Sequence, residues 1–158
     1  MSINLVKGQK ISLTKEDGSQ LKRVHMGLGW DVATGLFQSS IDLDASCILL
    51  DENKSVVDIV YFGRLNSSDG SIGHSGDSLT GAGDGDDEVI NVDLSTVPNK
   101  VTQIVFTINS FRGQAFDRVK NCFARLVETT TGKEICIFKL SEFTSSTAVI
   151  MAKVYRHN

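Results

Sequence analysis

Proline occurs only once in the 158 residues, at Pro98, which excludes a proline-rich linker between domains. Cysteine is also scarce, and Cys47, Cys122 and Cys136 form neither a C-x-x-C pair nor the even-numbered set of a disulfide framework. Each of the three lies in an apolar run. We therefore expect small, buried thiol side chains in a reducing compartment.

Long hydrophobic runs are absent as well. No stretch reaches the ~18 apolar residues of a membrane span, and the first ten residues lack the apolar core of a signal peptide. An excess of positive charge is missing too, because the formal net charge is −3, and this argues against sequence-independent nucleic-acid binding. We expect a soluble, cytoplasmic chain forming one domain, since 158 residues is an ordinary domain length.

The dominant hydrophobic period is two, which is typical of β-strands with one buried face. Apolar and polar residues alternate strictly over residues 41–47 before a fully apolar run at 48–50. Similar runs rich in Val, Ile, Phe and Thr predict eight further strands, at residues 10–15, 21–28, 56–62, 89–94, 102–109, 122–128, 134–140 and 148–155.

Turn residues separate these runs. Two of the gaps, at residues 51–54 and 129–133, predict β-hairpins. Nine short strands with turns between them favour an all-β fold, an antiparallel β-sandwich. We expect at most a short helix, within residues 114–120.

One segment differs from the rest in charge. Residues 65–99 contain no lysine or arginine and carry a net charge of −7, whereas the remainder of the chain carries +4. Six of the 14 glycines lie between residues 70 and 85. Long irregular loops inside a compact domain are usually functional or disordered. We therefore expect a long acidic, glycine-rich loop with a function.

The acidic loop favours a bound cation. Two carboxylates about 4 Å apart repel by roughly 4 kcal/mol at an effective dielectric near 20, and a cation removes that repulsion. Oxygen ligands suit Ca²⁺ or Mg²⁺, and a flexible glycine-rich backbone suits Ca²⁺ better than the strict octahedron of Mg²⁺. Asp42 and Asp44, two residues apart on a strand, would form a wall for this site; alternatively, both face water.

Known motifs do not explain the same residues. The loop lacks the glycine spacing of an EF-hand, and it lacks the Lys-Ser/Thr pair of a phosphate-binding loop. Residues 73–77 bring Ser, His and Asp together, yet without the nucleophile elbow of a hydrolase. We expect a protein that is not an enzyme. Two alternatives stay open: a metal-dependent enzyme acting on an oxyanion, and a module that binds membrane surfaces in a Ca²⁺-dependent way.

Five runs of the sequence resemble the TerD-domain family of tellurite-resistance and stress proteins. They are LVKGQ at 5–9, GLGWD at 27–31, IDLDA at 41–45, HSGDSLTGAGDGDDE at 74–88 and NSFRGQ at 109–114. Together they cover nearly the whole chain, and the run at 74–88 is the most specific. The insert at 35–37 and the run at 109–114 are most similar to the TerZ and TerX branch of the family.

The resemblance implies a Ca²⁺-binding sandwich similar to C2 domains, with a non-enzymatic role in tellurium resistance and stress response. It implies partners among other Ter-family or membrane-associated proteins, with no nucleic acid, and a single domain over residues 1–158 that lacks the family's final strand. The metal ligands that it carries over are Asp31, Asp42, Asp44, Asp69, Asp77, Gly83, Asp84, Gly85, Asp86, Asp87 and Glu88. Because these carboxylates exceed what one Ca²⁺ needs, we expect two ions.

Overall fold

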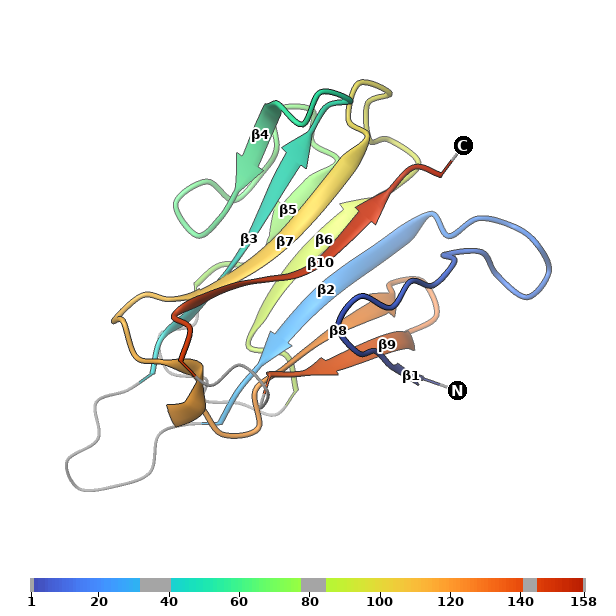
Figure 1. Ribbon diagram of the computed structural model, residues 1–158. Helices are drawn as coiled ribbons and strands as arrows, with labels where there is room; N and C mark the ends of the chain where they lie inside the picture. The colour runs from blue at the N-terminus through green and yellow to red at the C-terminus, as the bar shows by residue number, and fades with distance from the viewer. Residues whose placement is uncertain (1, 32–40, 78–84, 141–144, 158) are drawn as a thin grey trace.

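The computed structural model describes residues 2–31, 41–77, 85–140 and 145–157. Within these residues the chain forms two β-sheets that face each other (Figure 1). The larger sheet has the strand order β1-β9-β8-β2-β6-β5, and the smaller one has the order β10-β7-β3-β4. The strands are β1 (Ile3–Asn4), β2 (Arg23–Gly29), β3 (Leu43–Leu50), β4 (Val56–Val60), β5 (Ile72–His74), β6 (Glu88–Asp93), β7 (Gln103–Ser110), β8 (Phe123–Glu128), β9 (Lys133–Lys139) and β10 (Ala148–Tyr155).

The strand pairing confirms the predicted antiparallel sandwich. Every neighbouring pair is antiparallel except β1 and β9, which run parallel. Both predicted hairpins are present, because β3 joins β4 and β8 joins β9 through the expected turns. Lys54 and Gly132 adopt positive φ angles of 63° and 70° in these turns. The expected short helix is a single 3-10 turn at Phe116–Arg118.

One strand prediction is wrong, and two short strands were missed. Residues 10–15 form no strand and contribute only the isolated bridge between Thr14 and Gln20. The sequence analysis missed β1 and β5, which are two and three residues long and too short to show an alternating pattern. The acidic segment is therefore more ordered than predicted, since residues 72–74 form β5 and pair with β6, the strand expected at residues 89–94.

The hydrophobic core fills the space between the two sheets. Leu43, Ala45, Cys47 and Leu49 alternate along β3 and are at most 4% exposed, as expected for residues that share one face of a strand. All three cysteines are free and buried, as predicted. Burial raises the pKa of the Cys122 thiol to about 12, so this group stays protonated and unreactive at neutral pH.

Among the described residues, the only helical segment is the three-residue turn at Phe116–Arg118, and no helix there has the length or hydrophobicity to cross a bilayer.

One end of the sandwich gathers the segments that matter for function. Strands β2, β5 and β7 end there, and β3 and β6 begin there, because neighbouring strands run antiparallel (Figure 1). At this end β3 extends beyond β4, which pairs only with Cys47–Leu50. The start of β3 therefore has one edge that no strand of the described chain covers.

Candidate metal centre

Three carboxylates come together at this end of the sandwich. Asp42, Asp44 and Asp77 each offer one oxygen, and these three oxygens lie within 4.8 Å of one another. Asp42 and Asp44 are almost completely buried, at 3% and 2% exposure, whereas Asp77 is exposed. Gly76 directly precedes Asp77, and its φ of 108° lies in the positive region that glycine adopts most readily. The prediction that the pair on β3 meets the acidic segment agrees with this geometry.

The hydrogen-bonding groups around the cluster leave it incompletely satisfied. Asn109 lies opposite Asp44 in the β3–β7 register, and its Nδ2 donates to Asp44 Oδ2 over a long 3.5 Å. Arg112 Nε lies 4.0 Å from Asp42 Oδ2. The other oxygen, Asp42 Oδ1, is buried and has no hydrogen-bond partner among the described residues. A buried carboxylate oxygen without a donor is costly, and a bound cation would remove that cost.

The local environment disfavours the charged form of all three carboxyl groups. Burial raises the pKa of Asp42, and the charge of Asp77 adds to the shift. Burial, followed by the charges of Glu88 and Asp42, raises the pKa of Asp44 to about 6. Burial and the Glu88 carboxylate also raise the pKa of Asp77. Without a cation the cluster thus carries mutual repulsion that a positive ion would reverse.

Glu88 and His74 cover the free edge of β3. The Ala45 backbone N–H donates to Glu88 Oε2 at 2.8 Å, and His74 Nε2 lies 3.1 Å from the Ala45 carbonyl oxygen. The two side chains also contact each other, with His74 Nε2 3.4 Å from Glu88 Oε2. Both come from the other sheet, so these contacts replace the missing strand and tie the two sheets together beside the cluster.

Contacts at both ring nitrogens fix the orientation of the His74 side chain. The Gly76 N–H donates to Nδ1 at 2.9 Å, which places the proton of the neutral ring on Nε2, facing Ala45 and Glu88. Burial acts to lower the pKa of His74, but the hydrogen bond and charge of Glu88, the Ala45 carbonyl and the charge of Asp44 together outweigh burial, and the net direction is upward. Because neither nitrogen is left over, His74 serves as a structural partner of Glu88 rather than as a metal ligand.

Asp86 lies apart from the cluster, on the outer face of the larger sheet. Arg125 holds both of its oxygens, with distances of 2.8 Å from Nε to Oδ1 and 3.1 Å from Nη2 to Oδ2. The carboxyl group lies directly over Gly27, where a Cβ would come within 2.3 Å of it. This close approach explains a glycine inside β2. The structure thus gives this sequence-predicted ligand a side-chain partner of its own.

We expect Asp86→Asn to lower the free energy of unfolding by about 1–3 kcal/mol, because it breaks a largely buried bidentate ion pair. Calcium affinity should stay within about twofold, since Asp86 lies outside the cluster. Urea denaturation and calorimetry would measure the two effects. Asp93→Asn is the matched control, because Asp93 pairs with the exposed Arg23 at 3.4 Å, a surface contact worth about 1 kcal/mol or less. Calcium affinity lost in Asp86→Asn would instead make Asp86 a ligand.

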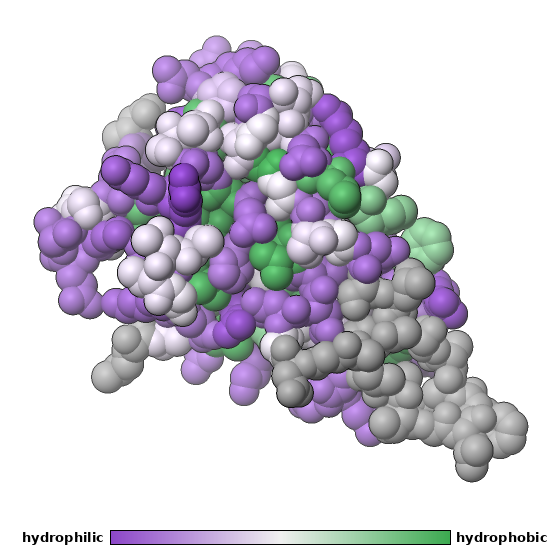
Figure 2. All heavy atoms as spheres, turned by 180° about the vertical axis from the view of Figure 1, so that it is seen from behind, coloured by the Kyte–Doolittle hydropathy of each residue, from purple (hydrophilic) through white to green (hydrophobic). Residues whose placement is uncertain are grey.

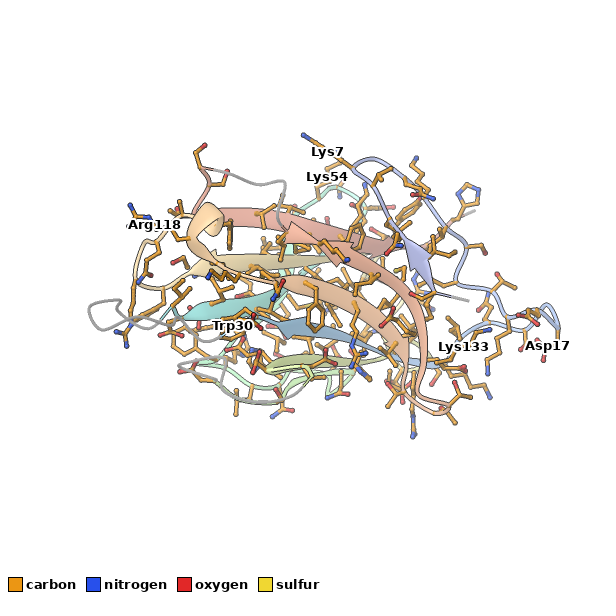
Figure 3. All side chains as sticks on the ribbon, turned by 90° about the horizontal axis from the view of Figure 1, so that it is seen from below. Lys7, Asp17, Trp30, Lys54, Arg118 and Lys133 are labelled. Carbon is orange, nitrogen blue, oxygen red and sulfur yellow. The ribbon has the colours of Figure 1, made fainter. Side chains whose placement is uncertain are left out.

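Asp31, Gly85 and Asp87 form a second group beside Trp30. Asp87 Oδ2 accepts a hydrogen bond from the Trp30 backbone N–H at 3.0 Å, and the charge of Asp31 is among the influences that raise the pKa of Asp87, after burial. Asp31 Oδ2 accepts a bond from Asn121. Gly85 has a φ of 97°, and its carbonyl oxygen lies close to Gly29. The indole Nε1 of the buried Trp30 donates to the Ile41 carbonyl, so the ring fixes the backbone beside this group, in the half of the molecule opposite Asp17 and Lys133 (Figure 3).

The remaining predicted ligands lie elsewhere. Asp69 Oδ1 accepts hydrogen bonds from the Ser71 N–H and the Ser67 hydroxyl in the turn before β5. Burial acts to raise the pKa of Asp69, and these bonds outweigh it and lower the value. Asp69 therefore stabilises a turn and is not part of the carboxylate cluster. Gly83 and Asp84 lie outside the described residues.

Sequence reasoning missed the roles of Asn109 and His74. The Asn109 contact depends on the β3–β7 register, which no local pattern specifies. The sequence analysis singled out His74 only as part of the Ser-His-Asp run at residues 73–77. Its contact with Glu88 depends on the pairing of β5 with β6.

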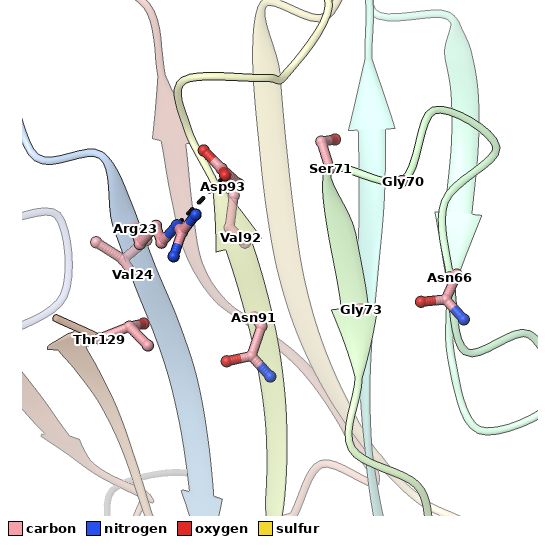
Figure 4. Close-up of a pocket in the computed structure, with 10 residues that line it drawn as sticks. All are labelled: Arg23, Val24, Asn66, Gly70, Ser71, Gly73, Asn91, Val92, Asp93 and Thr129. Atoms are coloured by element: carbon pink, nitrogen blue, oxygen red, sulfur yellow. Dashed lines mark ion pairs between the residues drawn. The ribbon is translucent and has the colours of Figure 1, made fainter.

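A separate hollow lies on the outer face of the larger sheet (Figure 4). It has a volume of about 300 Å³ and is lined by Arg23, Val24, Asn66, Gly70, Ser71, Gly73, Asn91, Val92, Asp93 and Thr129. Its one carboxylate, Asp93, pairs with Arg23 across the hollow. A metal ion would therefore find no carboxylate cluster in it.

The chain is similar to known proteins over its whole length. The family model of the TerD domain matches residues 1–158. The chain is 48% identical to the tellurium resistance protein TerZ of Serratia marcescens, with 99% of the chain and 84% of the relative covered. It is 42% identical to general stress protein 16U of Bacillus subtilis, with 100% and 86% covered.

A solved structure has the same fold. It is that of a homologue of the telluride resistance protein TerD from Streptomyces coelicolor, with a TM-score of 0.76, 24% sequence identity, and 87% of this chain and 82% of that chain covered. The family match and the identities above 40% are independent of that structure. The chain therefore belongs to the TerD domain family.

Proposed function

We propose that this protein binds Ca²⁺ through Asp42, Asp44 and Asp77 and acts in tellurium resistance and stress response without catalysing a reaction. The observation that carries the proposal is the cluster itself: three carboxylate oxygens within 4.8 Å of one another, with the buried Asp42 Oδ1 lacking any partner among the described residues. The names of the relatives, a tellurium resistance protein and a general stress protein, support the biological role.

The donor chemistry favours calcium over a transition metal. The three ligands are carboxylates, and the neighbouring His74 has both ring nitrogens engaged. Ca²⁺ accepts irregular sets of six to eight oxygens, including water and backbone carbonyls, whereas Zn²⁺ prefers a compact set with nitrogen or sulfur. The cluster is buried at Asp42 and Asp44 and exposed at Asp77. This arrangement suits an ion that completes its coordination shell with water.

A non-catalytic role fits the contacts of the Ser-His-Asp run. Ser75 Oγ accepts a hydrogen bond from the Val89 N–H at 2.9 Å, and His74 Nδ1 is occupied by the Gly76 N–H. Among the described residues, no base is therefore placed to activate Ser75, which argues against nucleophilic catalysis by this run. We infer that a bound ion stabilises a surface for partners, other Ter-family or membrane-associated proteins, rather than activating a substrate.

Calorimetry on chelator-treated protein tests the proposal. We expect Ca²⁺ binding in the submicromolar to tens-of-micromolar range, with Mg²⁺ binding much more weakly. Two ions remain our prediction: one at the cluster, and a second on the side of Asp31 and Asp87, whose carboxylates influence each other. A one-to-one stoichiometry would limit the site to the cluster. No heat and no spectral change at millimolar Ca²⁺ would overturn the proposed function.

A further inference from the structure

Three aromatic side chains form an exposed patch beside the carboxylate cluster. The aromatic patch consists of Tyr61, Phe62 and Phe111, which are 39%, 40% and 63% exposed. The Tyr61 and Phe62 ring centroids lie 5.5 Å apart, and those of Phe62 and Phe111 lie 5.9 Å apart, both in edge-to-face geometry. Figure 2 shows exposed hydrophobic residues, in green, on the right-hand side of the face that it draws.

The patch sits on two well-defined loop tips. Tyr61 and Arg64 exchange two backbone hydrogen bonds, of 3.1 and 2.8 Å, which hold Phe62 at the tip of a tight turn after β4. Phe111 follows β7, and its backbone N–H donates to the Asp42 carbonyl at 2.9 Å. Phe111 is thus fixed to the same residue that supplies a carboxylate to the cluster. The rings form a protruding surface with no covering segment among the described residues.

Two arginines flank the aromatic patch, and their partners differ. Arg64 Nη1 pairs with Asp58 Oδ1 at 2.7 Å. Arg112, next to Phe111, has only a loose contact of 4.0 Å with Asp42 Oδ2. Once Asp42 ligates a cation, Arg112 loses the attraction of that carboxylate and becomes free to contact another anion. The three carboxylates and Arg112 together carry a formal charge of −2, and one bound Ca²⁺ brings this local charge to about zero.

From this arrangement we propose that the aromatic patch docks on an anionic lipid surface when calcium is bound. The inference rests on the proposed function. Protruding aromatic rings with an arginine at their side fit the interfacial region of a bilayer, where rings bury their apolar part and guanidinium groups meet lipid phosphates. Without calcium the carboxylate cluster repels the same surface. Calcium binding removes that repulsion and leaves Arg112 to contact the lipid phosphates.

The small size of the aromatic patch favours a lipid surface over a protein partner. A stable protein interface buries about 1,200–2,000 Å² with complementary packing, which three side chains on two turns do not provide alone. Insertion into a fluid interface needs no complementary shape.

Sedimentation with phospholipid vesicles tests the proposal on the whole chain. We expect co-sedimentation with vesicles of phosphatidylcholine and phosphatidylserine in Ca²⁺, and release by chelator. Phosphatidylcholine vesicles should bind at least about tenfold more weakly, because they lack the anionic charge. Phe62→Ser and Phe111→Ser should each weaken binding by about tenfold, since each removes a large apolar side chain from the interface.

A matched control and a calcium titration keep the two proposals separate. Ile150→Ser, at a side chain 69% exposed on β10, should leave vesicle binding unchanged. Calorimetry of the phenylalanine variants should show unchanged Ca²⁺ affinity. Calcium binding without vesicle binding would overturn the docking proposal alone, and so would equal binding to both vesicle types or in the presence of chelator. A dimer in Ca²⁺ that depends on Phe62 and Phe111 would assign the aromatic patch to a second copy of the chain instead.

Discussion

Asp44→Asn should weaken calcium binding at least tenfold, which corresponds to about 1.4 kcal/mol. Asp44 is a buried member of the carboxylate cluster, and its replacement by a neutral amide removes one of three charges that attract the ion. The fold should persist, because an asparagine carbonyl can still accept the bond from Asn109. Calorimetry on both proteins measures the change, and Asp93→Asn serves as the control for loss of a carboxylate elsewhere. Unchanged affinity in Asp44→Asn would show that the cluster is not the calcium site.

The same substitution should stabilise the metal-free protein at neutral pH. The folded pKa of Asp44, about 6, lies above the unfolded value of 3.8, so folding takes up a proton between these pH values. The stability of the metal-free native state should therefore fall as pH rises from about 4 to 6, by an amount on the order of 2–3 kcal/mol from this group. Asp44→Asn removes that loss, and urea denaturation at pH 4 and pH 7 would detect the difference.

The alternating strands could be predicted because their signal is local. Residues 41–50 show both the period of two and the paired aspartates, and the structure places Asp42 and Asp44 at the start of β3 as a wall of the cluster. The expectation that such a pair might face only water is not met, since both are buried. The fully buried Glu88 arrives from another part of the chain and bonds to the Ala45 N–H beside this pair, a contact that the local pattern does not contain.

The distribution of the other carboxylates could not be predicted from charge density. Asp86, Asp87 and Glu88 are consecutive, yet the first pairs with Arg125 outside the sandwich, the second caps Trp30, and the third bonds to β3 between the sheets. Only Glu88 belongs to β6, and the backbone before it is irregular, with Gly85 at a φ of 97°, so no strand period fixes where Asp86 and Asp87 point. The composition of this run indicated a cation site, whereas the identity of its ligands depends on the register of β2 with β6.

Calcium should raise the melting temperature by roughly 5–10 °C at a hundredfold excess over Kd, and it should do so by ordering one end of the sandwich rather than by creating the fold. A ligand that binds only the native state at this excess contributes about 2.7 kcal/mol, and for a chain of this size that free energy corresponds to a shift of this order. Differential scanning fluorimetry with Ca²⁺ and with chelator measures it. Strands β3 and β7 contribute buried core residues such as Leu49 and Phe106, and the contacts of these side chains need no metal.

Amide hydrogen exchange would show where the stabilisation acts. Residues 66–74 already carry backbone hydrogen bonds, from Ser67 N–H to the Ile72 carbonyl and from His74 N–H to the Leu65 carbonyl, so they should be protected with or without calcium. New protection should concentrate after His74, up to about Val89, and at Asp42–Asp44, because these segments supply the cluster. Loss of protection throughout β3 and β7 on chelation would show instead that metal binding and folding are a single event. Retained protection there would mean that the bound ion fixes the geometry of Asp42 and Asp77 on a sandwich that is already folded, and such a change is local enough to act as a reversible switch.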